Sequence, residues 1–190
     1  ALGDSRQPIN RAGDLPGLSR AFVRAVCDRI GHGLTDEEAR CLDLGIVQLT
    51  RIDVTESWDF GSQGRALNAI RALSQHSHLS HRGRGSAIAE GTCIWGMGSR
   101  RWNGKAYAKG LELRKHQLPQ EISHRAELLD LADGLVRFEF TVRSMELRRR
   151  DLDYLCHWSR LGVTPASLHA ELMTQLTISE ATMLDATTLE

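Results

Sequence analysis

The clearest pattern in the sequence is a strict alternation of apolar and polar residues over 135–143. The apolar positions are Val136, Phe138, Phe140 and Val142, and the polar positions are Arg137, Glu139, Thr141 and Arg143. Successive side chains of a strand point to opposite faces of its sheet. The pattern therefore predicts a β-strand with one face in the core and the other face charged.

Weaker alternation predicts three further strands, over 46–55, 92–97 and 105–113. The last two are joined through residues 98–104, whose glycines and Asn103 suit a hairpin-like reversal. The basic segment His76–Gly85 between a predicted helix and these strands is expected to be a loop. Neighbouring strands joined in this way favour antiparallel pairing.

Apolar residues spaced three to four apart predict helices over 18–30 and 63–75, the second capped by Ser62. Further helices are expected over 121–133, 146–160 and 165–177. The last of these begins with Thr164 at the N-cap and Pro165 at the first helical position. Strands interleaved with helices predict an α+β fold in which helices flank a mainly antiparallel central sheet.

Composition excludes several classes of protein. The chain has 190 residues, of which 41% are hydrophobic, and its 24 Lys and Arg balance 24 Asp and Glu, which is typical of a folded domain and not of a disordered chain. It has no apolar run of the roughly 20 residues that cross a bilayer, so we expect a cytoplasmic protein that does not bind membranes. The four cysteines form no CxxC pair, which favours reduced thiols. Because the chain begins at Ala1, we expect that residues preceding it are missing.

Positive charge is concentrated in the middle of the chain. Between His81 and Lys115 there are eight Lys and Arg against Glu90 and Glu112, whereas no Lys or Arg follows Arg160. The middle of the chain is therefore where an anion is expected to bind, although this charge pattern is by itself a weak sign of nucleic-acid binding.

Three predicted strands bring polar residues to what would be one face of the sheet. These are Asp53 with Arg51, Tyr107 with Lys105 and Lys109, and Glu139 with Arg137. Carboxylates hold divalent cations, a tyrosine beside lysines can act as a nucleophile, and arginines hold phosphate. Together they suit a metal-assisted attack on a phosphodiester. A simple solvent-covered face is the alternative interpretation.

Four blocks of sequence, in one order, resemble the gene II replication initiators of filamentous phages. They are Arg51-Ile52-Asp53, then Trp95-x-x-x-Ser99-Arg100, then Tyr107-x-Lys109-x-x-Glu112-Leu113, and finally Leu128-Leu129 with Gly134-Leu135-Val136-Arg137-Phe138-Glu139. The series is also similar to plasmid rolling-circle initiators, which are related in mechanism to the HUH endonucleases.

The resemblance implies a rolling-circle initiator that nicks and rejoins the plus strand of a single-stranded or supercoiled origin, leaving a free 3′-OH for the host replication machinery. Tyr107 is implied as the nucleophile, forming a 5′-phosphotyrosine link, and Lys109 as the group that holds the phenolate or the phosphate. Asp53, Glu139 and Glu112 are the implied ligands of Mg²⁺ or Mn²⁺. DNA-binding roles are expected for Arg51, Ser99, Arg100, Arg101, Lys105 and Arg137.

The same resemblance implies a nickase domain over 1–145 and a helical extension over 146–190, in the cytoplasm of a bacterial host cell. A non-catalytic module that binds the origin or controls replication is the alternative.

Two features depart from the family patterns. The His-x-His segment here, His76-Ser77-His78, has a polar middle residue, unlike the metal-binding strand of most HUH enzymes, and we assign it no ligand role. Strict alternation also places Glu112 opposite Tyr107, so that a shared site would need a bulge or turn near Gly110.

Overall fold

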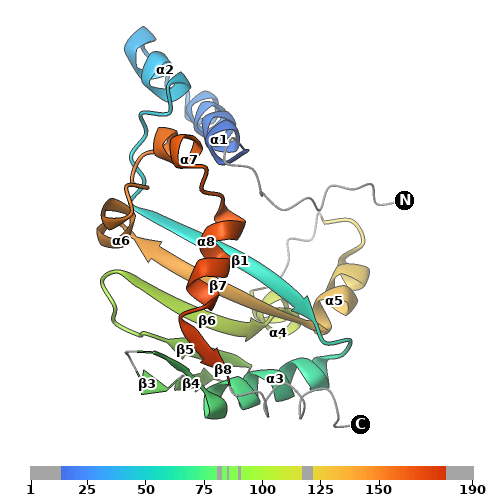
Figure 1. Ribbon diagram of the computed structural model, residues 1–190. Coiled ribbons are helices and arrows are strands. Elements are labelled where there is room, and N and C mark those ends of the chain that lie inside the picture. Colours follow the sequence, from blue (N-terminus) through green and yellow to red (C-terminus); the bar gives the residue numbers. More distant parts are fainter. Residues whose placement is uncertain (1–13, 81–82, 85, 90, 117–121, 179–190) are drawn as a thin grey trace.

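The structure is a computed structural model that describes residues 14–80, 83–84, 86–89, 91–116 and 122–178 (Figure 1). Its central sheet has five strands in the order β1-β7-β6-β5-β4, and every neighbouring pair is antiparallel. The strands are β1 (Arg51–Asp59), β4 (Ser86–Ala89), β5 (Thr92–Trp95), β6 (Trp102–Ala108) and β7 (Leu135–Arg143). The predicted α+β fold with a mainly antiparallel sheet is confirmed.

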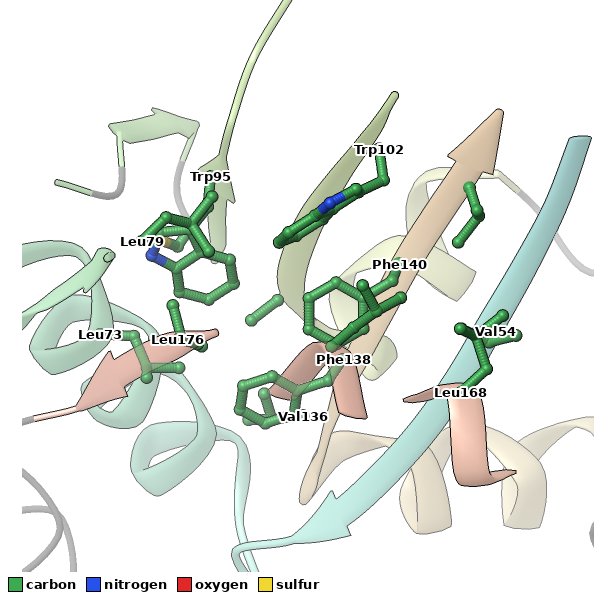
Figure 2. Close-up of a cluster of buried hydrophobic side chains, with 14 of the residues drawn as sticks. Val54, Leu73, Leu79, Trp95, Trp102, Val136, Phe138, Phe140, Leu168 and Leu176 are labelled. Carbon is green, nitrogen blue, oxygen red and sulfur yellow. The ribbon is translucent and has the colours of Figure 1, made fainter. Parts of the chain in front are cut away.

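One face of the sheet forms the core with two helices, α3 (Gln63–His76) and α8 (Pro165–Met173). The four alternating apolar residues of β7 are all buried, and Leu73 of α3 and Leu168 of α8 pack against them in the same cluster (Figure 2). Each large apolar side chain buried here contributes about 1.5–3 kcal/mol. The strand predicted over 135–143 is therefore confirmed. Its first and last residues match the prediction, and its apolar side chains point into the core.

The predicted helix caps are also confirmed. The Ser62 hydroxyl accepts a hydrogen bond from the Arg65 amide, and Thr164 forms a reciprocal capping box with Ser167 before Pro165. These bonds satisfy amide groups that the first turn of a helix leaves unpaired.

A second, three-stranded sheet corrects two predictions. Its order is β3-β2-β8, with β2 (Ser77–Leu79), β3 (Gly83–Arg84) and β8 (Leu176–Ile178). The segment 76–85, predicted as a loop, therefore contains strands where it is described, and the helix predicted to end at residue 177 ends at Met173. Strands of two or three residues are too short to show an alternation. In addition, β2 pairs with β8, which lies far along the chain, so the local sequence does not indicate either strand.

The remaining helices are α1 (Asp14–Ile30), α2 (Asp36–Asp43), α4 (Lys109–Lys115), α5 (Arg125–Asp133), α6 (Ser144–Arg149) and α7 (Leu155–Leu161). The single helix predicted over 146–160 is wrong, because Asp151 adopts a positive φ of 56° and breaks it into α6 and α7. A left-handed residue cannot continue a right-handed helix. Helix α2 was not predicted, and part of the segment predicted as helix over 121–133 lies outside the described residues.

The first strand begins later than predicted. Residues 46–50 precede β1, and of these Gln48 makes an isolated bridge to Tyr154. Within the part of the chain that the structure describes, no helix has the length and apolar character needed to cross a membrane.

Gly104 tests how tightly the core is packed. A Cβ atom added there would lie 2.7 Å from Cε1 of the buried Phe140 ring. We expect Gly104→Ala to lower the free energy of unfolding by about 1–3 kcal/mol in urea denaturation, because the ring has no room to move. In Gly64→Ala, a control with open space around the new methyl group, the free energy should stay unchanged or rise. Equal effects of the two substitutions would contradict this account of the packing.

Candidate active site

The face of the sheet opposite the core carries polar side chains in four rows that cross β1, β7 and β6. From one end to the other the rows are Arg51 with Arg143 and Arg101, Asp53 with Thr141 and Asn103, Thr55 with Glu139 and Lys105, and Ser57 with Arg137 and Tyr107. Successive rows are about 6.6 Å apart, because each step is two residues of a strand.

Tyr107 lies at the end of this face and is held by its neighbour Glu139. The Tyr107 hydroxyl donates a hydrogen bond of 3.1 Å to Oε2 of Glu139. The other carboxylate oxygen, Oε1, forms an ion pair of 2.9 Å with Nζ of Lys105, which also lies 4.9 Å from the centre of the Tyr107 ring. Glu139 thus connects the phenol to a lysine, and the three side chains form one bonded unit.

The environment of Tyr107 keeps its phenol neutral. Burial, followed by the negative charge of Glu139, raises the pKa of Tyr107 to about 12, although Arg137 in the same row opposes the shift. A phenolate at this position therefore needs additional positive charge or transfer of its proton to a nearby base.

The strand predicted over 105–113 ends at Ala108, and helix α4 follows at once. Glu112 therefore lies in a helix and not in a strand, so the alternation that placed it on the face opposite Tyr107 does not apply. Residues 111–115 all have high helix propensity, but Gly110 beside them has a low one, so the sequence did not indicate where the helix begins. Lys109 and Glu112 form an ion pair of 2.5 Å, and Nζ of Lys109 lies 5.8 Å from the Tyr107 ring centre.

Gly110 sets the position of α4. A Cβ atom on this residue would lie 2.8 Å from Cα of Asp133, so only glycine allows α4 to approach the end of α5 this closely. Asp133 in turn forms an ion pair with Arg114 of α4. The two contacts fix the helix that carries Lys109 and Glu112.

An open pocket with a volume of about 220 Å³ lies between the end of β6 and α4. Tyr107, Lys105 and Glu112 line it, together with Lys115 and His116. Lys115 and His116 were not predicted as site residues. They follow Glu112 by three and four positions, the spacing that shares one helix face, so a helix recognised at Lys109 would have identified them.

Asp53 lies two rows away from Tyr107, about 13 Å along the strands. Arg51 donates two hydrogen bonds to its carboxylate, of 3.1 and 2.7 Å. Burial by itself raises the pKa of Asp53, but the hydrogen bonds from Arg51 and Thr141 outweigh burial and the pKa is lowered. Asp53 is therefore a carboxylate that stays ionised at neutral pH.

The three carboxylates expected to hold a metal are not gathered in one place. Asp53 and Glu139 are diagonal neighbours on adjacent strands, with their Cα atoms roughly 7–8 Å apart. The Asp53 carboxylate is bonded to Arg51, and the Glu139 carboxylate is bonded to Tyr107 and Lys105. Glu112 lies beyond Tyr107 and pairs with Lys109. Over the described ranges, the group of three ligand atoms lying within 4.8 Å of one another is formed instead by Asp151, Asp153 and His157. Asp53 and Glu139 offer oxygen ligands of the kind that a hard cation takes, and Glu112 does not join them.

The residues expected to bind DNA divide between the two ends of the face. Arg137 lies in the row of Tyr107, where its Nε donates a hydrogen bond of 3.1 Å to Ser57. Ser99, Arg100 and Arg101 precede β6 at the end opposite Tyr107. Their roles stay predictions.

Comparison with known proteins identifies the family. The family model that describes the N-terminal part of a phage replication-associated protein, the gene II product, matches residues 9–160. The chain belongs to this family. The expected resemblance to the gene II replication initiators is thereby confirmed.

One curated relative in the gene II family shows how much of such a protein the chain represents. The replication-associated protein of Enterobacteria phage I2-2 is 29% identical over 180 residues, which cover 92% of this chain and 50% of the relative. The chain therefore spans about half the length of the relative it matches. No solved structure matches the chain.

The pairing of Tyr107 with Glu139 predicts a measurable pKa. Alkaline titration followed by near-ultraviolet absorbance, taken as the difference from Tyr107→Phe, should place the pKa of Tyr107 at about 12. In Glu139→Gln the pKa should be lower, because the substitution removes a negative charge that disfavours the phenolate. The same midpoint with Gln as with Glu at position 139 would show that the two side chains do not interact.

Proposed function

We propose that this chain is the nicking domain of a rolling-circle replication initiator, with Tyr107 as its nucleophile. The observation that carries the proposal is the position of Tyr107, which lines an open pocket together with Lys105 and Lys115 and whose hydroxyl bonds to the Glu139 carboxylate. Membership of the gene II family supports it, because these are replication-associated proteins. The proposed nicking domain covers residues 1–145, and in the segment that follows α8 completes its core and β8 pairs with β2.

Glu139 is the proposed proton acceptor for Tyr107. As the phenol oxygen attacks the phosphorus, its proton passes to Oε2 of Glu139, to which it is already bonded. The phosphorus–O3′ bond breaks, the 5′-phosphate stays on Tyr107, and the released O3′ takes a proton from water. The hydroxide that remains takes the proton from Glu139, which returns to the carboxylate. The phosphotyrosine link conserves the energy of the broken bond, so attack by a 3′-OH reverses the step and rejoins the strand.

Three lysines supply the positive charge that this reaction needs. Lys105 and Lys115 line the pocket, and Lys109 lies beside the Tyr107 ring. Positive groups fixed before the reaction stabilise charge on the phosphate in the transition state without reorganising. The raised pKa of Tyr107 makes such positive charge on the phosphate side necessary, because it disfavours a free phenolate.

Asp53 and Glu139 are the residues proposed to hold Mg²⁺ or Mn²⁺. A divalent cation bound there would act as a Lewis acid toward phosphate oxygens. The pairing of Asp53 with Arg51 keeps this carboxylate ionised and oriented toward the polar face. Glu112 is proposed to position Lys109 and not to bind the metal directly.

The proposed substrate is the plus strand of an origin, single-stranded or supercoiled. The proposed setting is the cytoplasm of a bacterial host, where the free 3′-OH would serve the host polymerase.

A covalent adduct tests the nucleophile. With Mn²⁺ and a labelled pool of single-stranded and hairpin oligonucleotides, the wild-type chain should form an adduct that survives a denaturing gel, and Tyr107→Phe should form none. Tyr154→Phe is the matched control, since the chain contains two tyrosines. An adduct that persists in Tyr107→Phe would refute the assignment. Binding of DNA by the wild type without any adduct would favour a non-catalytic module that binds origins or controls replication.

The metal proposal predicts a shift in cation dependence. Asp53→Asn should raise the Mn²⁺ concentration needed for half-maximal adduct formation about tenfold or more, because even the outer partners of a metal site typically change affinity by that amount. Asp130→Asn, on the exposed side of α5, should leave the Mn²⁺ dependence unchanged. Identical Mn²⁺ curves for the wild type and Asp53→Asn would exclude Asp53 as a ligand.

A further inference from the structure

A row of arginines lies at the far end of the polar face, and two of its members, Arg101 and Arg143, have no role in the proposed chemistry. Arg51 lies directly opposite Arg143 in the β1–β7 ladder. The Arg143 amide donates a hydrogen bond of 2.8 Å to the Arg101 carbonyl, next to the Trp102–Val142 pair. The three arginines thus follow one another across three chain segments. All three are exposed, and the alternation of the strands puts them on the same face as Tyr107.

Two arginines of this row, Arg101 and Arg143, carry positive charge that no carboxylate among the described residues neutralises. Like charges directly opposite each other destabilise a sheet. Among the described residues, Arg51 pairs with Asp53, whereas the side chains of Arg101 and Arg143 have no carboxylate partner. Arg100 and Arg148 add exposed positive charge on the two segments that lead away from the row.

A neighbouring cluster shows the contrast. Arg149 and Arg150 both bind the buried carboxylate of Glu146, and Arg150 also binds Glu171. Those arginines belong to an ion-pair network that holds α6 against the rest of the fold. The guanidinium groups of Arg101 and Arg143 remain available for an external anion.

We propose that Arg51, Arg101 and Arg143 form a second DNA contact, a phosphate-binding row for the backbone that flanks the nicking position. Guanidinium groups bind phosphate with paired hydrogen bonds, and three of them side by side across the face suit the phosphates of a backbone that runs along the strands toward Tyr107. The placement of this contact relative to the cut rests on the proposed function, whereas the binding itself does not.

The register of the sheet gives the distance between the two contacts. Three row steps separate the arginine row from the row of Tyr107, or about 20 Å along the strands. At about 3.4 Å for each base pair, this length corresponds to about six base pairs of duplex. The polar face would therefore hold the backbone at a fixed distance from the nucleophile.

The test measures DNA affinity without requiring any cleavage. A labelled 20-base-pair duplex and a labelled 20-nucleotide single strand, both of arbitrary sequence, are titrated by fluorescence anisotropy at several salt concentrations. The proteins are the wild type, the double variant Arg101→Gln with Arg143→Gln, and Arg125→Gln as the matched control on α5. Circular dichroism melting confirms that each variant is folded.

The double variant should lose affinity, and the slope of log K against log salt should fall in magnitude by about 1.8 for duplex or about 1.4 for single strand, since two phosphate contacts are lost. Whichever DNA shows the loss identifies the form that lies on the row. Arg125→Gln should bind like the wild type. Because no cleavage is measured, the result does not depend on whether Tyr107 is the nucleophile, so a failure of the nicking chemistry is distinguishable from a failure of this proposal. Wild-type affinity and salt slope in the double variant, or an equal loss in Arg125→Gln, would overturn it.

Relief of the like-charge contact gives a second readout. Because Arg51 and Arg143 repel each other across the ladder, the double variant should melt at the same temperature as the wild type or above it when DNA is absent. Added duplex should raise the melting temperature of the wild type more than that of the variant. A clear loss of stability in the variant without DNA would show that the row is structural, which would overturn the proposal.

Discussion

The alternation of β7 ties the hydrophobic core and the candidate site into one unit. Each residue that it buries fixes the direction of the next one, so Phe138 and Phe140 in the core hold Glu139 on the opposite face beside Tyr107. A shift of one residue in the pairing of β6 with β7 would bury Glu139 and expose the phenylalanines. Exposing the phenylalanines and burying the Glu139 carboxylate would both cost free energy, and this cost keeps Tyr107 and Glu139 in register.

The charged side chains at the two ends of the polar face differ in whether they have partners of opposite charge. Near Tyr107, two lysines are paired with carboxylates. Lys105 pairs with Glu139, and Lys109 pairs with Glu112. These pairs orient groups around a phenol whose pKa is raised to about 12. At the other end, Arg101 and Arg143 have no carboxylate partner in the described chain, an arrangement suited to binding an anion and not to adjusting the pKa of a neighbour.

Elements with a local sequence pattern were predicted correctly, and elements that depend on contacts between distant segments were not. Nine alternating residues predicted β7 correctly, and Ser62 and Thr164 predicted two helix starts. The short strands β2 and β8 were missed because their pairing joins distant segments, and the start of α4 was hidden by Gly110, which is there for its close approach to Asp133. For the site, the sequence predicted that Tyr107, Lys105 and Glu139 share a face; it did not predict that Glu139 bonds the phenol, nor that Asp53 is two rows away.

The most direct measurement is the identity of the residue that carries DNA after the reaction. Trypsin digestion of the isolated adduct, followed by mass spectrometry, should find the nucleotide on the peptide Ala106–Lys109, which contains Tyr107 between two trypsin sites. Its mass should correspond to a 5′-phosphate ester of the tyrosine. A nucleotide attached to the peptide that contains Tyr154, or to a serine, would contradict the assignment of Tyr107 as the nucleophile.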